Sequence, residues 1–222
     1  MFKFDIDRNV PPWDMPSVNF RLLLVTDRTQ AGGRSLPSLI RQAISAGLPA
    51  IQLRERDLST NELLVLAQDI QAVTKPGSVS LIINDRVDLL MALNWDGVHL
   101  RADSLPSVAV RRVIGPRRLI GVSTHSAEEV RSANHDGADY VVFGPIFDTP
   151  SKRSFGPPLG LDRLSDVCRQ SRIPVFAIGG MTSERVRDVR RAGAHGVAVI
   201  GALLTRDDVG AAVREFREAL ET

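Results

Sequence analysis

The feature that most constrains the fold of this 222-residue chain is a regular alternation of short apolar runs with longer segments of helical periodicity. The short runs are rich in β-branched residues and predict strands, whereas the longer segments gather their apolar residues on one helical face. The predicted strands span residues 22–26, 50–53, 80–83, 97–100, 119–122, 140–143, 175–178 and 196–200. The predicted helices span residues 35–46, 60–73, 87–93, 107–114, 127–135, 161–170, 183–192 and 207–220.

Eight strand–helix units within one chain of this length predict a parallel (β/α)8 TIM barrel. The alternative is a doubly wound open sheet, which needs fewer strands. Dinucleotide-binding forms of that sheet carry a glycine-rich first turn, whereas the first turn here reads Thr26-Asp27-Arg28. We therefore expect one TIM-barrel domain over residues 20–222, preceded by a short irregular N-terminal extension over residues 1–19.

The composition excludes several classes of protein. No apolar run approaches the roughly 20 residues of a membrane span, and charged residues interrupt any signal-peptide core at the N-terminus. The net charge is only +2 and the basic residues form no stripe, so no nucleic-acid partner and no membrane partner is expected. The single cysteine, Cys168, cannot form an internal disulfide and fits a cytoplasmic protein. The sequence leaves open whether the chain forms a homo-oligomer.

The loop that follows the sixth predicted strand is rich in groups that bind anions. It runs from Gly144 to Lys152 and contains two prolines, the hydroxyls of Thr149 and Ser151, and the Lys152 ammonium group. Prolines shape such a loop in advance, and hydroxyl and ammonium donors suit a phosphate. The alternative is an ordinary surface turn with a solvated Lys152.

Polar side chains also follow the second predicted strand. Gln52 and Arg54 are two residues apart, so both side chains point to the barrel axis if Ile51 and Leu53 face the helices. An arginine in that position needs an anionic partner. The partner is either an internal carboxylate, such as that of Glu55, or a bound ligand.

Two further sets of residues suggest how a phosphorylated ligand is held. Asp85 ends one strand region and Asp103 follows the next, and such carboxylates suit Mg²⁺, which is shared with substrate phosphates. Glycines follow the seventh and eighth strands, where barrels often bind phosphate through backbone N–H groups. The predicted phosphate-binding residues of these two loops are Gly179, Gly180, Ile200 and Gly201.

These motifs together carry a family resemblance. In chain order they are Gln52-Leu53-Arg54-Glu55-Arg56, Ile82-Ile83-Asn84-Asp85-Arg86-Val87-Asp88, Gly97-Val98-His99-Leu100, Gly121-Val122-Ser123-Thr124-His125-Ser126, Asp136-Gly137-Ala138-Asp139-Tyr140, Gly144-Pro145-Ile146-Phe147 and Ile178-Gly179-Gly180. The chain resembles thiamine phosphate synthase from about residue 22 to residue 202, within the superfamily that also contains the thiazole tautomerases.

The resemblance implies a condensation of an aminopyrimidine-methyl diphosphate with a thiazole phosphate, assisted by Mg²⁺ and passing through a carbocation-like state. It implies pyrimidine diphosphate contacts from Gln52, Arg54, Arg56 and Asn84. It implies positions around the two substrates for Ser123, Thr149, Ser151 and Lys152, and a thiazole phosphate site at Gly180, Ile200 and Gly201. We expect Arg54, Ser123, Lys152 and His125 to be catalytic and Asp85 and Asp103 to be the metal ligands.

Three departures from the family pattern leave other functions open. Where Gly-Gln-x-Asp is common, this chain reads Arg101-Ala102-Asp103-Ser104, so an ungapped match puts Ser104 at a metal-ligand position. Arg56 replaces a common lysine, and Asp148 replaces a common proline. One alternative is a thiazole tautomerase, with His125 as the acid and base that moves protons. Another is a non-catalytic barrel that binds thiamine-related phosphates.

Overall fold

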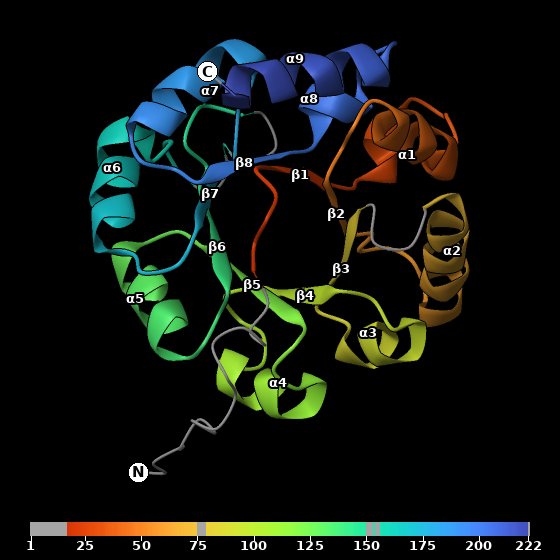
Figure 1. Cartoon of the computed structure of the whole chain (residues 1–222), viewed down its shortest axis with the longest axis horizontal. Helices are drawn as coiled ribbons and strands as arrows, with labels where there is room; N and C mark the ends of the chain where they lie inside the picture. The colour runs from red at the N-terminus through yellow and green to blue at the C-terminus, as the bar shows by residue number, and fades with distance from the viewer. Residues whose placement is uncertain (1–16, 75–78, 150–152, 154–155, 222) are drawn as a thin grey trace.

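The computed structural model describes residues 17–74, 79–149, 153 and 156–221. Eight parallel strands close into a barrel whose strand order follows the sequence, and the helices form a ring around it (Figure 1). The strands are β1 (Leu22–Val25), β2 (Ala50–Leu53), β3 (Ser80–Asn84), β4 (Gly97–Leu100), β5 (Leu119–Thr124), β6 (Tyr140–Phe143), β7 (Val175–Ala177) and β8 (Gly196–Val199). The predicted TIM barrel is confirmed.

The helices follow the strands in the predicted alternation. They are η2 (Arg28–Ala31), a 3₁₀ turn, and α1 (Leu36–Ser45), α2 (Thr60–Val73), α3 (Val87–Leu93), α4 (Ser107–Ile114), α5 (Ala127–His135), α6 (Gly160–Gln170), α7 (Ser183–Arg191), α8 (Gly201–Leu204) and α9 (Val209–Glu221). Predicted and observed bounds differ by no more than two residues. The sequence reading missed only the short elements η2 and α8.

Pairing between the first and last strands closes the sheet. Leu22 lies opposite Val197, and Leu24 lies opposite Val199. This pairing leaves no open edge, so the alternative of a doubly wound open sheet is wrong. None of the helices in the described part of the chain is long and apolar enough to cross a bilayer.

Side chains of the strands alternate between two separate cores. One cluster lies between the strands and the surrounding helices and includes Ile51 and Leu53. The other fills the barrel, where the rings of Phe20, Tyr140 and Phe176 pack with centroids 5.3 to 5.9 Å apart. Burial of these aromatic rings contributes a large part of the inner core. Phe20 therefore belongs to the barrel, and the exact division between extension and domain stays a prediction.

Two carboxylates, Asp96 and Asp139, tie neighbouring strands together at the amino end of the barrel. Asp96 precedes β4 and accepts a 2.8 Å hydrogen bond from the backbone N–H of Leu81 in β3. Asp139 precedes β6 and accepts 2.6 Å hydrogen bonds from the Ile120 backbone N–H of β5 and from Arg111 Nη2. Burial raises the pKa of Asp139, against the opposing effect of the Arg111 charge.

The imidazole of His99 in β4 is fully buried inside the barrel and bonded at both nitrogens. Nδ1 lies 3.2 Å from the Tyr140 hydroxyl, and Nε2 lies 2.9 Å from Ser123 Oγ. Burial lowers the pKa of His99 to about 3, and the Arg54 charge acts in the same direction. His99 is therefore neutral in the folded protein at physiological pH.

Replacing Asp139 with Ala should reduce the free energy of unfolding by about 3 kcal/mol, because the largely buried Arg111 guanidinium loses its carboxylate. Urea denaturation measures this loss. Asp69→Ala, on the exposed face of α2, is the matched control and should change the free energy of unfolding by less than about 0.5 kcal/mol. Equal stability of Asp139→Ala and the wild type would contradict the anchoring role.

The burial of neutral His99 should make folding sensitive to acid. Above pH 6.5 both states are neutral. As pH falls from 6.5 towards 3, the unfolded chain binds a proton that the native state excludes, so stability falls. Between pH 7 and pH 5 the loss from this residue should be about 2 kcal/mol.

Urea denaturation at both pH values measures that loss in the wild type, in His99→Gln and in His135→Gln, whose imidazole is exposed. His99→Gln should lose less stability on acidification than the other two proteins. The same pH dependence in all three would show that His99 is not the group responsible.

Candidate active site

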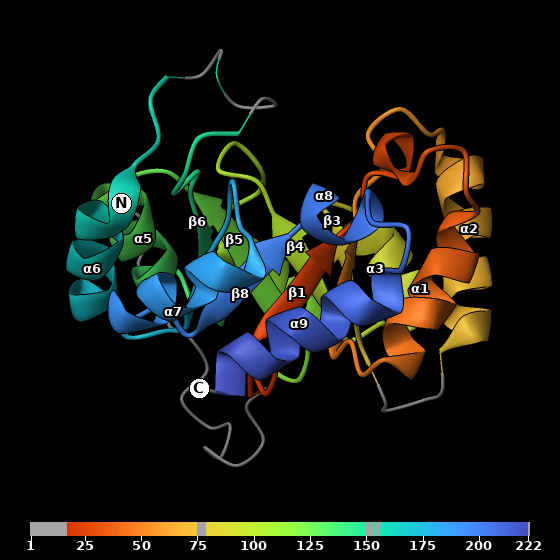
Figure 2. The same ribbon diagram turned by 90° about the horizontal axis from the view of Figure 1, so that it is seen from above.

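The carboxyl ends of the strands surround a cavity of about 570 Å³, in the size range of small-molecule sites. Every strand, or the loop that follows it, contributes to the wall, and the short helix α8 lies at this end of the barrel (Figure 2). The predicted site residues in the wall are Gln52, Arg54, Arg56, Asn84, Asp103, Ser123, His125, Thr149, Gly179, Gly180, Ile200 and Gly201. Ser151 and Lys152 lie outside the described residues.

The deepest polar groups of the cavity are paired with one another. Gln52 Nε2 donates a 3.0 Å hydrogen bond to Asn84 Oδ1, so one amide from β2 meets one from β3. His99 Nε2 lies against Ser123 Oγ and fixes that hydroxyl near the axis. The predicted inward direction of Gln52 and Arg54 is confirmed.

Arg54 and Arg56 face the cavity without a carboxylate partner among the described residues. Glu55, the internal partner considered from the sequence, is bound instead by Arg28, whose backbone N–H lies 3.0 Å from Oε2. Asp27 accepts hydrogen bonds from the Thr29 hydroxyl at 2.5 Å and from Gln30 Nε2 at 2.7 Å.

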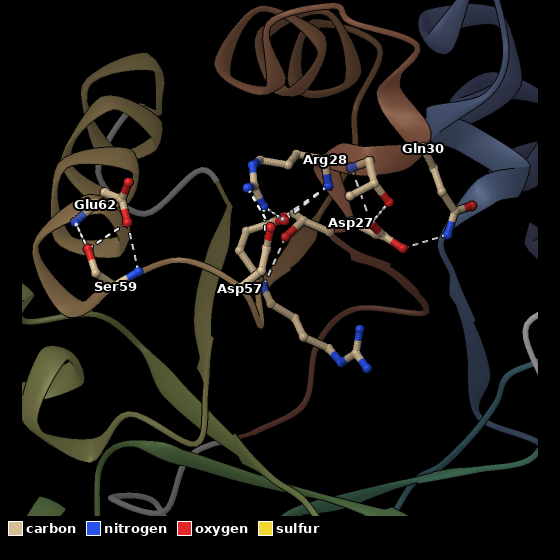
Figure 3. A network of polar contacts seen from close by, with 10 residues as sticks. Asp27, Arg28, Gln30, Asp57, Ser59 and Glu62 are labelled. Atoms are coloured by element: carbon tan, nitrogen blue, oxygen red, sulfur yellow. Dashed lines mark hydrogen bonds and ion pairs between the residues drawn. The ribbon is translucent and has the colours of Figure 1, made fainter.

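This network keeps the carboxylates nearest to Arg54 occupied. Figure 3 shows the Arg28 guanidinium directed at Asp57 and the Gln30 amide directed at Asp27. Burial lowers the pKa of Arg54, and the positive charge of Arg56 adds to the effect. A half-buried guanidinium beside a second one favours a bound anion, because an anion offsets both the desolvation and the repulsion.

Asp85 lies at the end of β3 and is aimed at the loop after β4. Its φ of 58° is in the left-handed region, which few non-glycine residues adopt. Oδ1 accepts a hydrogen bond from the Ser104 hydroxyl and a 3.1 Å bond from the Arg101 backbone N–H. Oδ2 lies 2.9 Å from Arg101 Nε.

Asp103 does not share an open cation site with Asp85. Its side chain is 76% exposed, and its Oδ1 lies 3.1 Å from Arg101 Nε. The Arg101 guanidinium thus joins the two carboxylates, and the described residues contain no group of three His, Cys, Asp or Glu side chains suited to a metal. In this arrangement the predicted ligands do not fit Mg²⁺, which requires free carboxylate oxygens in octahedral geometry.

Two loops from neighbouring strands form a wall of closely packed backbone opposite the arginines. The Ile146 N–H donates a 2.8 Å bond to the Ile178 carbonyl, and the Phe147 N–H donates a 3.1 Å bond to the Gly179 carbonyl. Gly180 has a φ of 62°, and a Cβ there would lie 2.6 Å from the Asp148 carbonyl oxygen. Only glycine fits this position without moving the loop.

Side chains fix the outer surface of the same wall. Arg185 donates to the Gly180 carbonyl and lies with its guanidinium carbon 4.6 Å from the Phe147 ring centroid. Asp148, which stands where the family commonly has proline, accepts a 2.6 Å hydrogen bond from Arg153 Nη2. The Asp148 side chain is therefore engaged in an exposed ion pair rather than directed at the cavity.

His125 lies in the wall beside the sixth strand. Its Nδ1 is 2.6 Å from the Gly144 carbonyl oxygen, and a carbonyl can only accept a hydrogen bond, so Nδ1 carries the proton. The other ring nitrogen is then the one left for a ligand when the imidazole is neutral.

Three residues that shape the site were not predicted from the sequence. Gln30 comes from the η2 turn, which the sequence does not predict. A Cβ added to Gly201 would lie only 2.7 Å from Gln30 Oε1. Arg101 and Ser104 were noticed only as departures from a family pattern. Their direct contacts with Asp85 depend on the loop conformation after β4, which no periodic pattern encodes.

Comparison with known proteins gives consistent results. The family model described as thiamine monophosphate synthase matches residues 22–203. The thiamine-phosphate synthase of Roseiflexus castenholzii is 43% identical over 203 residues, which cover 91% of this chain and 89% of the relative. That of Chloroflexus aurantiacus is 42% identical over 200 residues, or 90% and 92% of the two chains.

A solved structure agrees with these sequence relatives. The thiamine phosphate pyrophosphorylase from Pyrococcus furiosus superposes with a TM-score of 0.82 at 31% identity. The superposition covers 90% of this chain and 95% of that one.

Proposed function

The chain belongs to the thiamine monophosphate synthase family, and we propose that it is a transferase that makes thiamine phosphate. In this reaction an aminopyrimidine-methyl diphosphate and a thiazole phosphate give thiamine phosphate and free diphosphate. The observation that carries the proposal is the pair of inward arginines, Arg54 and Arg56, which have no carboxylate partner among the described residues. Relatives named as synthases do not favour the tautomerase or the non-catalytic barrel.

The arginine side of the cavity suits the diphosphate substrate. Guanidinium groups bind phosphate oxygens through paired, charge-assisted hydrogen bonds. The paired amides of Gln52 and Asn84 lie below them and offer donors and acceptors to an aminopyrimidine ring. We assign the pyrimidine diphosphate to this side, with Lys152 as a further predicted contact.

The glycine side of the cavity suits the thiazole phosphate. Gly179 and Gly180 follow β7, and Ile200 and Gly201 follow β8, so their backbone reaches the cavity without a bulky side chain. Backbone N–H groups exposed in this way bind a phosphate monoester. Ser123 and Thr149 are predicted to contact the substrates between these two sides, where the substrates meet.

The bond changes need no nucleophile from the protein. The bond between the methylene carbon and the diphosphate oxygen breaks, and the oxygen keeps the electron pair. The thiazole nitrogen then donates its lone pair to the methylene carbon and becomes quaternary, so no proton is lost. The rate depends on positioning the substrates and on neutralising the negative charge that grows on the leaving diphosphate. The arginines supply the neutralising positive charge.

The predicted Mg²⁺ ligation by Asp85 and Asp103 is not part of this proposal, because Arg101 contacts both carboxylates. A cytoplasmic location, which rests on the composition, stays a prediction. Burial raises the pKa of the Cys168 thiol to about 11, so that cysteine is unreactive at neutral pH and compatible with a role in packing.

Replacing Arg54 with Gln should lower kcat/KM for thiamine phosphate formation by roughly 100-fold, because a charged donor to the leaving group is removed. A steady-state assay of thiamine phosphate with both substrates measures the change. Arg163→Gln, on the exposed surface of α6, is the control and should retain wild-type activity. A loss of less than threefold in Arg54→Gln would reject the assigned contact.

Replacing Gly180 with Ala should raise KM for the thiazole phosphate roughly tenfold, equivalent to about 1.4 kcal/mol. The added Cβ meets the Asp148 carbonyl oxygen and pushes the wall into the cavity. Gly137→Ala introduces a comparable backbone strain at φ 81° with no atom within 4 Å, at the far end of the barrel. Equal KM values for the two variants would show that strain, not the cavity wall, explains any defect.

A further inference from the structure

The loop after β4 places the positively charged Arg101 side chain beside the two carboxylates that are predicted to be metal ligands. Arg101 Nε lies 2.9 Å from Asp85 Oδ2 and 3.1 Å from Asp103 Oδ1. Arg101 Nη2 lies 3.2 Å from Asp103 Oδ2. One guanidinium therefore contacts both of the carboxylates that the sequence suggests as magnesium ligands.

The other hydrogen-bond acceptor positions of the Asp85 carboxylate are also occupied. Ser104 and the Arg101 backbone N–H donate to Oδ1, and Asn84 Nδ2 lies 3.3 Å from Oδ2. A hydroxyl at position 104 supplies a donor where a carboxylate would supply a charged ligand. A divalent ion at Asp85 would have to displace a guanidinium and several hydrogen bonds without gaining a second fixed carboxylate.

Arg101 is nevertheless open to a ligand. Its side chain is 47% exposed, and it lines the same cavity as Arg54 and Arg56. Its two ion pairs leave part of the five-donor guanidinium fork for another anion. Three guanidinium groups from the β2 and β4 loops therefore face one cavity.

We propose that Arg101 takes the place of a divalent cation at Asp85. The chain then binds a diphosphate group through its arginines in the absence of Mg²⁺. This inference rests on the proposed function for the identity of the ligand, but the ion pairs that carry it are independent of that function. Arg101 is a ligand-binding cation in this scheme, and Asp85 and Asp103 are the residues that position it.

Calorimetric binding of inorganic pyrophosphate in a buffer with EDTA tests the first part of the proposal. The wild type should bind, Arg101→Ala should bind at least tenfold more weakly, and Arg101→Lys should stay within about threefold of the wild type. Arg86→Ala is the matched control, because Arg86 pairs with Asp88 at the same end of the barrel but lies outside the cavity wall. Wild-type binding only after Mg²⁺ is added, or unchanged binding by Arg101→Ala, would overturn the proposal.

Electron paramagnetic resonance of Mn²⁺ with the substrate-free protein tests the second part. The double variant Arg101→Ala/Ser104→Asp, which removes the internal cation and adds a carboxylate, should bind Mn²⁺ at least tenfold more tightly than the wild type. Circular dichroism checks that it is folded. Equally tight Mn²⁺ binding by the wild type would contradict the assignment of Arg101.

A product assay separates this inference from the proposed function. Absence of thiamine phosphate with both binding results as expected would contradict the function and support the role of Arg101. Formation of thiamine phosphate with pyrophosphate binding that is independent of Arg101 would support the function and overturn the inference.

Discussion

Closure of the barrel by the pairing of β1 with β8 is the constraint on which the site depends. Once Leu22 and Leu24 pair with β8, the eight parallel strands end in one ring. Loops that are far apart in the chain, such as those after β1 and β8, then face a common cavity. An open sheet with the same strand order would place the loops after β1 and β8 at opposite edges, so the arginines and the glycine wall would not face each other.

The alternation of side chains along each strand then determines which groups reach the cavity. In β2, Ile51 and Leu53 pack against helices, and this leaves Gln52 and Arg54 for the interior. A polar group buried there needs a partner, and neighbouring strands supply it. Gln52 pairs with Asn84 of β3, and the His99 imidazole of β4 pairs with Ser123 of β5. The pairing of these polar side chains deep in the cavity is thus a consequence of strand register.

The sequence predicts the elements of this architecture more completely than their contacts. Hydrophobic period, caps and glycines locate the strands, the helices and the inward direction of Gln52 and Arg54. Which carboxylate each arginine meets depends instead on loop conformation. The 3₁₀ turn η2 brings Arg28 to Glu55, 27 residues away, and the left-handed backbone of Asp85 brings it to Arg101. Neither conformation has a periodic signature, so both pairings required the structure.

The distribution of carboxylates gives the two sides of the cavity different electrostatic characters. At β2, Arg28 binds Glu55, so the charge of Arg54 is not neutralised by the carboxylate next to it in sequence. At β4, Asp85 and Asp103 hold Arg101 in place and largely offset its charge. A dianionic or trianionic group entering the cavity is therefore attracted first to the β2 side. Arg101, whose charge is already offset by its two carboxylates, can add hydrogen-bond donors as negative charge accumulates on the ligand. The carboxylates also avoid the cost of burying an unpaired charge before the ligand arrives.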